Sequence, residues 1–382
     1  MRLLILPDAT TFVREHAMIA RLQVGLADEG VRVVQGVPGS AAGTEAASLL
    51  AGGVYALSVR HQDRGLPLME GLRAEALARD VEALARGESA ERALDAVLAL
   101  GDGAWTTALR VGQRLGAAVV LSVEGRGQVE RAGAVWRRAG RSGNGREGVR
   151  PLFVTPGDHL ADALATGVPR SRVVVAPWGV YPTRAAHAPV DRGRSLSVVV
   201  LLSGRDAEAA RGALLGLERA AETTPDLHVI VDADAARRLD LWRWTAAKPS
   251  IRGRLTLTSN LDGRHDLVTE ADMLLVPESL GQARGLVLQA MADGMLVAAR
   301  EDALVDWLIP GVTCCVLEDA RAETVARRVL ALADDPRAGG ALRASAKEWV
   351  QVHRPASAYV RGVLAALTSA TDSGVPAKLT QT

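Results

Sequence analysis

A stretch from residue 271 to residue 294 has the spacing of a phosphate-binding turn. It reads ADMLLVPESLGQARGLVLQAMADG, so a short apolar run precedes a turn with Gly281 and Gly285, and a helical pattern follows. At such a helix start the backbone amides and the positive end of the helix dipole can hold a diphosphate. The same residues also fit a plain strand–turn–helix connection, and the pattern leaves both interpretations open.

Short apolar runs alternate with stretches of helical period along most of the chain, which is typical of parallel sheets flanked by helices. This pattern predicts the α/β class. Residues 90–100 are predicted to be helical, between helices at 67–86 and 104–115. Because 382 residues exceed what one hydrophobic core usually supports, two domains are expected. The predicted organisation is a first Rossmann-like domain at 1–182, a linker at 183–195, a second Rossmann-like domain at 196–355, a helix at 356–367 and a disordered tail at 368–382.

Composition argues against several classes of protein. The 45 basic and 44 acidic side chains give a net charge of +1, which disfavours a nucleic-acid partner. The seven histidines are scattered and the two cysteines adjoin, so neither a zinc site nor a disulfide framework is expected. Neither a Gly-x-Gly-x-x-Gly fingerprint after the first strand nor a Walker lysine loop is present, which disfavours dinucleotide oxidoreductases and P-loop enzymes.

The stretch 271–294 resembles the retaining GT-B glycosyltransferases, in particular their large family 4 of nucleotide-sugar enzymes. In that family an Asp, apolar residues and Pro-Ser precede a Glu, and a second Glu comes eight positions later, before Ala-Met-Ala-x-Gly. Asp272, Pro277 and residues 289–294 match this frame. Arg205, with Arg211 and Gly212, resembles the family's Gly-Arg…Lys-Gly element, with arginine for lysine and one extra residue between. Weaker matches extend over nearly the whole chain, at 15–30, 173–180 and 309–313.

The resemblance implies a GT-B fold, with two Rossmann-like domains that face each other across a cleft. It also implies transfer of a sugar from a nucleotide-sugar donor, with retention, and no metal ion or other cofactor. Arg205 and Arg211 would then stabilise the leaving diphosphate, because guanidinium groups suit phosphate contacts. The remaining donor-binding residues that the resemblance implies are Gly281, Gln282, Gly285, Leu286, Val287 and Gln289.

The sequence also departs from the family at the residues that matter most for catalysis. Aligned on Ala-Met-Ala, the first family Glu falls on Gly281 and the second on Gln289, so the Glu-x7-Glu motif is degenerate. Gln289 could still hydrogen-bond a ribose through its amide. Gly281 has no side chain to offer, and Gln282 or Glu278 lies close enough in sequence to replace the first carboxylate. Glu124 is the only candidate where the family usually has a catalytic histidine.

Two hypotheses follow from these matches and departures. The first is a glycosyltransferase, favoured by Arg205, Arg211 and the Gln-Ala-Met-Ala helix. The alternative is a catalytically degenerate GT-B protein that binds a sugar or nucleotide or serves as a scaffold for a protein partner. The acceptor could be a glycan, a lipid or a small molecule. A cytoplasmic location is expected, with peripheral attachment to the inner face of the membrane left open.

Overall fold

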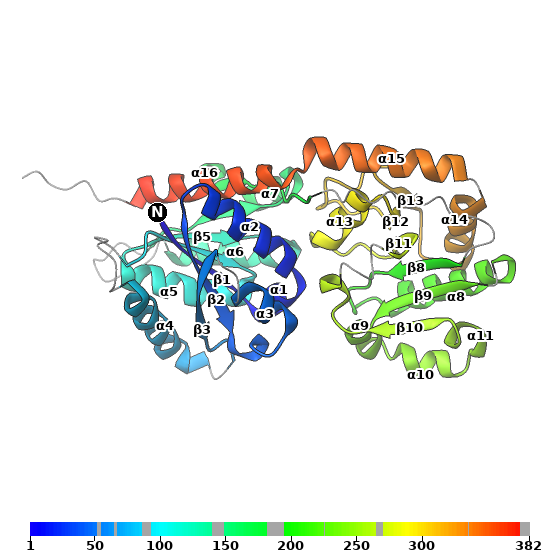
Figure 1. Ribbon diagram of the computed structural model, residues 1–382, viewed down its shortest axis with the longest axis horizontal. Coiled ribbons are helices and arrows are strands. Elements are labelled where there is room, and N and C mark those ends of the chain that lie inside the picture. Colours follow the sequence, from blue (N-terminus) through cyan, green and yellow to red (C-terminus); the bar gives the residue numbers. More distant parts are fainter. Residues whose placement is uncertain are drawn as a thin grey trace, which may run out of the picture. The chain divides into compact units, whose positions relative to one another are not determined.

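The computed structural model describes residues 1–51, 55–64, 67–85, 93–139, 149–181, 195–224, 226–264, 270–334 and 336–374. The chain forms two compact units (Figure 1). Unit 1 comprises Met1–Trp178 and Ala356–Thr382, and unit 2 comprises Gly179–Pro355. Of the linker predicted at 183–195, only residue 195 lies within the described residues. No described helix is long and apolar enough to span a membrane.

Unit 1 is built on a parallel sheet of seven strands in the order β3-β2-β1-β4-β5-β6-β7. The strands are β1 (Arg2–Pro7), β2 (Arg32–Pro38), β3 (Ala56–His61), β4 (Ala96–Leu100), β5 (Ala118–Ser122), β6 (Leu152–Thr155) and β7 (Val173–Val175). The helices are α1 (Ala9–Arg14), α2 (His16–Asp28), α3 (Glu45–Ala51), α4 (Glu70–Ala85), α5 (Trp105–Leu115), α6 (Arg126–Ala139), α7 (Asp158–Ala165) and α16 (Ala356–Gly374).

Unit 2 has a parallel sheet of six strands in the order β10-β9-β8-β11-β12-β13. The strands are β8 (Leu196–Val200), β9 (Leu227–Asp232), β10 (Leu255–Thr258), β11 (Met273–Val276), β12 (Leu296–Arg300) and β13 (Cys315–Leu317). The helices are α8 (Ala207–Thr223), α9 (Ala233–Arg238), α10 (Leu241–Ala246), α11 (Pro249–Arg252), α13 (Gly285–Asp293), α14 (Ala322–Asp334) and α15 (Pro336–His353). The prediction of two α/β units is confirmed.

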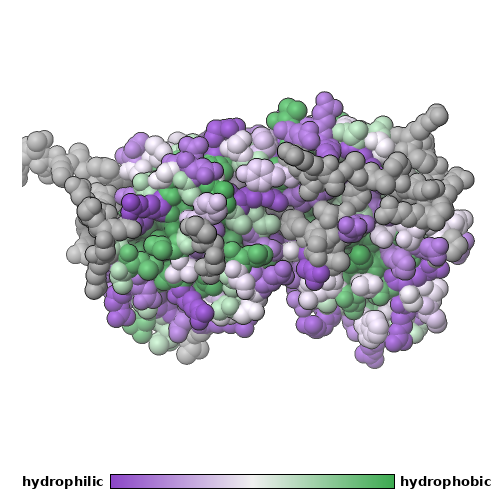
Figure 2. Space-filling model, viewed as in Figure 1, coloured by the Kyte–Doolittle hydropathy of each residue, from purple (hydrophilic) through white to green (hydrophobic). Residues whose placement is uncertain are grey.

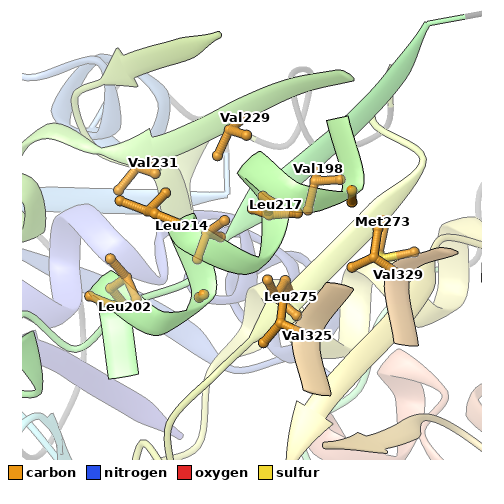
Figure 3. Close-up of a cluster of buried hydrophobic side chains, with 14 of the residues drawn as sticks. Val198, Leu202, Leu214, Leu217, Val229, Val231, Met273, Leu275, Val325 and Val329 are labelled. Atoms are coloured by element: carbon orange, nitrogen blue, oxygen red, sulfur yellow. The ribbon is translucent and has the colours of Figure 1, made fainter. Parts of the chain in front are cut away.

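The core of unit 2 lies between its sheet and two helices on one face. Figure 3 shows Leu214 and Leu217 of α8 pointing toward Val198, Val229 and Leu275 of the strands, beside valines of α14. Because helices cover these strands, the strand sequences are short apolar runs and do not alternate between apolar and polar residues. The core therefore fixes the strand ends from which the loops described below emerge.

The prediction of a helix at residues 90–100 is wrong. Residues 96–100 form β4, which lies between β1 and β5, and all five side chains are completely buried. A central strand of a parallel sheet is apolar on both faces, so its sequence lacks the period-2 signal that separates a strand from a helix.

The C-terminal helix is longer than predicted. We expected it to end at residue 367 and the tail to be disordered from 368, but α16 continues to Gly374. Leu367 and Ala370 are buried in unit 1, so the extra turns are held by apolar packing rather than by sequence propensity. Residues 375–382 of the predicted tail lie outside the described residues.

Helix α16 packs against α2 and β5, and glycines allow the close approach (Figure 1). A Cβ atom at Gly362 would lie 2.6 Å from Ala176 Cα, and one at Gly25 would lie 2.4 Å from a methyl carbon of Val360. The backbone at Ala176 has no flexible end that could move aside. Gly362 is therefore required by packing, although glycine is a poor residue for a helix interior.

Gly362→Ala is expected to lower the free energy of unfolding by about 1–2 kcal/mol, because overpacking outweighs the gain in helix propensity. Gly340→Ala is the matched control, since a Cβ at Gly340 in α15 meets nothing within 4 Å. This control should raise the stability by up to about 1 kcal/mol. Urea denaturation followed by circular dichroism measures both changes. Equal stabilisation by the two substitutions would contradict the packing of α16.

The edge strand β3 and its neighbours expose apolar side chains. Leu57 of β3 is 52% exposed, Leu72 of α4 is 63% exposed, and Leu68 in the 3-10 turn η2 (Pro67–Met69) is 93% exposed. Figure 2 shows apolar side chains among polar ones on the visible face of unit 1. These side chains belong to the surface, so we expect polar substitutions there to change the stability little.

Candidate functional site

In unit 2 the strand order reverses between β8 and β11, which pair side by side as parallel strands. In open α/β sheets, ligands bind outside the carboxyl ends of the strands at such a switch point. The loop after β8 carries Ser203, Gly204 and Arg205, and the loop after β11 carries Glu278 and Gly281. Two of the stretches singled out from the sequence are thus brought together by the fold.

Glu278 joins these two loops. One carboxylate oxygen accepts the backbone N–H of Ser203 and the other accepts its hydroxyl, both at 2.6 Å. The hydroxyl oxygen in turn accepts the backbone N–H of Arg205 at 3.1 Å. The Glu278 side chain is buried, so both of its oxygens serve to hold the loop that carries Arg205.

Arg205 and Arg211 are both exposed, one in the loop after β8 and the other on the fifth residue of α8. The side chain of Asp206 caps α8 by accepting the N–H of Ala209 at 2.9 Å. Neither guanidinium group forms an ion pair or a side-chain hydrogen bond within the part of the chain that the structure describes. Both are therefore available to an anionic ligand.

The position of Gly281 is fixed by its backbone conformation and by a backbone hydrogen bond. Its φ is 60°, in the left-handed region, and its N–H donates to Asp302 Oδ2 at 2.7 Å. The other oxygen of Asp302 accepts the N–H of Leu304 at 3.0 Å. A glutamate at position 281, where the resemblance places one, would therefore be strained. The amide of Gly281 is already used by Asp302.

The start of α13 lies at the end of the same loop. Arg284 precedes the helix and its side chain does not cap it; instead its guanidinium forms a forked ion pair with Asp262, with Nε 2.9 Å from Oδ1. Gly285 is half-buried, and Leu286 and Val287 are buried. Within the described residues no side chain caps the first turn of α13, but the N–H of Val287 donates to the Arg284 carbonyl at 3.2 Å. The amides of Gly285 and Leu286 can therefore face a phosphate, and that of Val287 is already used.

Gln289 points into unit 2. Its side chain is buried, and its amide nitrogen donates to Asp293 Oδ1 at 2.8 Å and to the carbonyl of Tyr181 at 3.4 Å. Gln282, by contrast, is half-buried in the loop. A ribose contact through Gln289, as the resemblance implies, would require these interior hydrogen bonds to be exchanged.

In unit 1 the corresponding switch point lies between β1 and β4. Asp8 follows β1 and caps α1 by accepting the N–H of Thr11 at 2.8 Å. Its other oxygen accepts the N–H of Gly103, in the loop after β4, at 3.1 Å. Gly101 has a φ of 80°, and a Cβ there would lie 2.2 Å from the Asp8 carboxylate. The Asp8 carboxylate thus fills the space beside Gly101 and Gly103 at this switch point.

Glu124, the other catalytic candidate, is completely buried just after β5 in unit 1. Arg14 Nη2 lies 3.1 Å from one carboxylate oxygen, and the Ser122 hydroxyl donates to the other at 3.2 Å. Burial raises the pKa of Glu124 to about 7, although Arg14 opposes the shift. Burial also raises the pKa of Tyr359 on α16, and the nearby Glu124 adds to that shift. The two catalytic candidates therefore lie in different units, each with internal partners.

The raised pKa of Glu124 predicts a pH-dependent stability. Between pH 4.5, the ordinary glutamate value, and pH 7, the folded protein keeps a proton on Glu124 that the unfolded chain has released. The stabilisation from this group is therefore present at low pH and is lost as the pH rises to 7. Relative to Glu124→Gln, the wild-type protein should lose up to about 3 kcal/mol of stability between pH 4.5 and 8.

Chemical denaturation at several pH values measures this difference. Glu29→Gln, at an exposed position, is the control and should leave the profile unchanged. Identical pH profiles for the wild-type protein and Glu124→Gln would contradict a proton on Glu124 in the folded state.

Two groups at the carboxyl ends of the unit 2 strands were not predicted from the sequence. The ion pair of Arg284 with Asp262 joins residues 22 positions apart. Arg238, at the end of α9, donates from Nη2 to the carbonyl of Ser203 at 3.4 Å. Arg238 was detectable only as one of two adjacent arginines, because its place depends on the pairing of β8 with β9. Within the described residues, no group of three or more His, Cys, Asp or Glu side chains could hold a metal ion.

Comparison with known proteins agrees with this topology. No protein-family model matches the sequence, and a comparison with curated proteins found no match. Solved structures do match. The structure of Anabaena HepE in complex with UDP and glucose matches 97% of this chain and 100% of the HepE chain, with a TM-score of 0.72 and 11% identity. The chain has the GT-B fold.

Two further GT-B structures show a similar likeness. A glycosyltransferase from Rickettsia africae matches 96% of this chain and 97% of its own, with a TM-score of 0.67 and 11% identity. Sucrose-phosphate synthase from Thermosynechococcus elongatus matches 96% and 98%, with a TM-score of 0.67 and 16% identity. At such identities the likeness establishes the GT-B fold alone, and function has to be argued from the site.

Proposed function

We propose that unit 2 binds the diphosphate of a nucleotide sugar at the carboxyl ends of β8 and β11, and that the protein is a glycosyltransferase. The observation that carries this proposal is the pair Arg205 and Arg211. Both are exposed and lack an acidic partner among the described residues, and both follow the switch-point strand β8. The GT-B structures in complex with UDP, or with UDP and glucose, support a nucleoside diphosphate as the ligand.

The geometry supplies what a departing diphosphate needs. When the bond from the anomeric carbon to the diphosphate oxygen breaks, the electron pair and the negative charge stay on that oxygen. Guanidinium groups and helix-start amides stabilise such charge through short charge-assisted hydrogen bonds. Arg205 and Arg211 would supply the cations, and the helix-start amides of Gly285 and Leu286 would supply the dipole. Glu278 contributes by holding the Arg205 loop in place.

The acceptor hydroxyl would add to the anomeric carbon, and its proton would pass to the departing diphosphate oxygen. We propose retention of configuration, on the resemblance to family 4. The acceptor class stays a glycan, a lipid or a small molecule. A cytoplasmic location, with attachment to the inner face of the membrane as the second option, also stays a prediction.

A specific observation favours the second candidate, a GT-B protein that binds a nucleotide or sugar without turnover and acts through a protein partner. Gly281 and Gln289 stand where carboxylates are expected, and the carboxylates of Glu124 and Glu278 are buried with internal partners. Such a protein would keep the arginines and the amides while lacking a group beside the transferred sugar.

Turnover distinguishes the two candidates. The full chain is incubated with UDP-glucose, GDP-mannose and ADP-glucose, and release of the nucleoside diphosphate is followed with and without a mixture of polyol acceptors. Release from one donor, with the anomeric configuration of the product read by NMR, is the result we expect. Binding of a donor with no release would favour the second candidate, and failure to bind any donor would contradict both.

A further inference from the structure

We infer that Arg238 is a further ligand of the donor diphosphate, and that it clamps the phosphate from the β9 side together with Arg205. This inference rests on the proposed function, because it names a residue of that same site. Neither the phosphate-binding pattern in the sequence nor the resemblance points to Arg238. The fold brings it to the loop after β8.

The position of Arg238 is set by strand pairing. Strands β8 and β9 run parallel with Val200 opposite Val231, so both end at the same edge of the sheet. Asp232 ends β9 and caps α9 by accepting the N–H groups of Asp234 and Ala235, each at 2.9 Å. Helix α9 is only six residues long, so Arg238 at its end still lies beside the loop that follows β8.

Gly204 gives Arg238 direct access to the backbone of that loop. Its φ is 76°, and a Cβ at this position would lie 2.4 Å from Arg238 Nε and 2.8 Å from Nη2. The guanidinium therefore lies against the Gly204 backbone, with Nη2 3.4 Å from the Ser203 carbonyl. Arg205 is the next residue along the chain. The Arg238 guanidinium thus lies against the residue that directly precedes Arg205.

The arginines beside Gly204 differ from several others of unit 2 in their ion pairs. Arg237, Arg284 and Arg354 each have an acidic partner. Within the described residues, neither Arg205 nor Arg238 has one. Asp206, next to Arg205, caps α8, and Asp234, four residues before Arg238, pairs with Arg237. Two uncompensated positive charges at a switch point suit a doubly charged diphosphate.

Arg211 is less well placed than Arg238 to contact a diphosphate beside the loop after β8. It lies five residues into α8, more than one helical turn past the cap. The next residue, Gly212, is fixed by packing, since a Cβ there would lie 2.1 Å from the carbonyl oxygen of Ala320. Arg238, in contrast, already contacts the loop. We therefore expect Arg238 to contribute at least as much diphosphate affinity as Arg211.

The test compares two adjacent arginines of α9. Calorimetric titrations with UDP and with uridine are made on the wild-type protein, Arg238→Ala and Arg238→Lys, and on Arg237→Ala as the matched control. Arg237 is exposed and paired with Asp234, so its loss should change UDP affinity by less than about twofold. Arg238→Ala should weaken UDP binding by about 10–100-fold and leave uridine binding unchanged. Arg238→Lys should recover part of the loss.

The other outcomes separate the inference from the proposed function. Wild-type binding of UDP with equal affinities for Arg238→Ala and Arg237→Ala would overturn the role of Arg238 alone. An equal loss of affinity for UDP and for uridine in Arg238→Ala would also overturn it, because a side chain that contacts only the diphosphate cannot affect binding of the nucleoside. No binding of UDP, GDP or ADP by the wild-type protein at millimolar concentration would overturn the proposed function and this inference together.

Discussion

Arg205→Ala combined with Arg211→Ala is expected to weaken nucleoside-diphosphate binding by at least about 100-fold. A hydrogen bond to a charged group contributes about 1.5–3 kcal/mol, and the double substitution removes two such donors. Both side chains are exposed, and within the described residues neither has a partner that would be left unpaired. The melting temperature should therefore stay within about 2 °C of wild type.

Arg219→Ala is the matched control, since Arg219 also lies on α8 but pairs with Glu323 at the surface. This variant should bind UDP like the wild-type protein. Calorimetric titration and thermal unfolding on the same preparations give both readouts. A large drop in the melting temperature of the double variant would show that Arg205 and Arg211 are structural.

Arg354→Ala is expected to lower the stability of unit 2 by about 3–5 kcal/mol, the usual effect of breaking a buried ion pair. Arg354 Nη2 lies 2.5 Å from Asp306, and both side chains are largely buried. The guanidinium also lies over two tryptophan rings, 5.0 Å from the centre of Trp307 and 5.8 Å from that of Trp349. The backbone carbonyl of Arg354 accepts the N–H of Val180 at 3.0 Å, and the chain returns to unit 1 two residues after Arg354.

Two controls separate charge from stacking. Arg354→Lys keeps the charge but loses the planar fork, so it should recover only part of the stability. Arg219→Ala breaks an exposed pair and should cost less than about 1 kcal/mol. Urea denaturation followed by circular dichroism measures the stability of each variant. A loss of less than about 1 kcal/mol for Arg354→Ala would contradict a buried ion pair.

The sequence predicts the architecture well where apolar runs are separated by clear helical stretches. The runs at 3–6, 196–202 and 273–276 became central strands of two parallel sheets. The prediction failed at β4, whose five apolar residues carry no periodicity because both of its faces are covered. It also ended α16 too early, since the last turns depend on packing in unit 1, which sequence propensity does not report.

The candidate site was only partly predictable for a related reason. Arg205 and the α13 turn were found because each belongs to a local pattern of a strand, a glycine and a helix. The contact of Glu278 with Ser203 spans 75 positions, and that of Arg238 with Ser203 spans 35. Such contacts depend on strand order, so they become visible only when β8 has β9 on one side and β11 on the other.

The central claim is that the carboxyl ends of β8 and β11 bind a nucleoside diphosphate, and one calorimetric titration tests it most directly. The wild-type protein is titrated with UDP, GDP and ADP, each alone and as its sugar conjugate, beside the Arg205→Ala and Arg211→Ala double variant. The prediction is saturable binding of one base, tightened by a particular sugar and lost in the double variant. No binding of any of these ligands at millimolar concentration, or equal binding by the double variant, would contradict the claim.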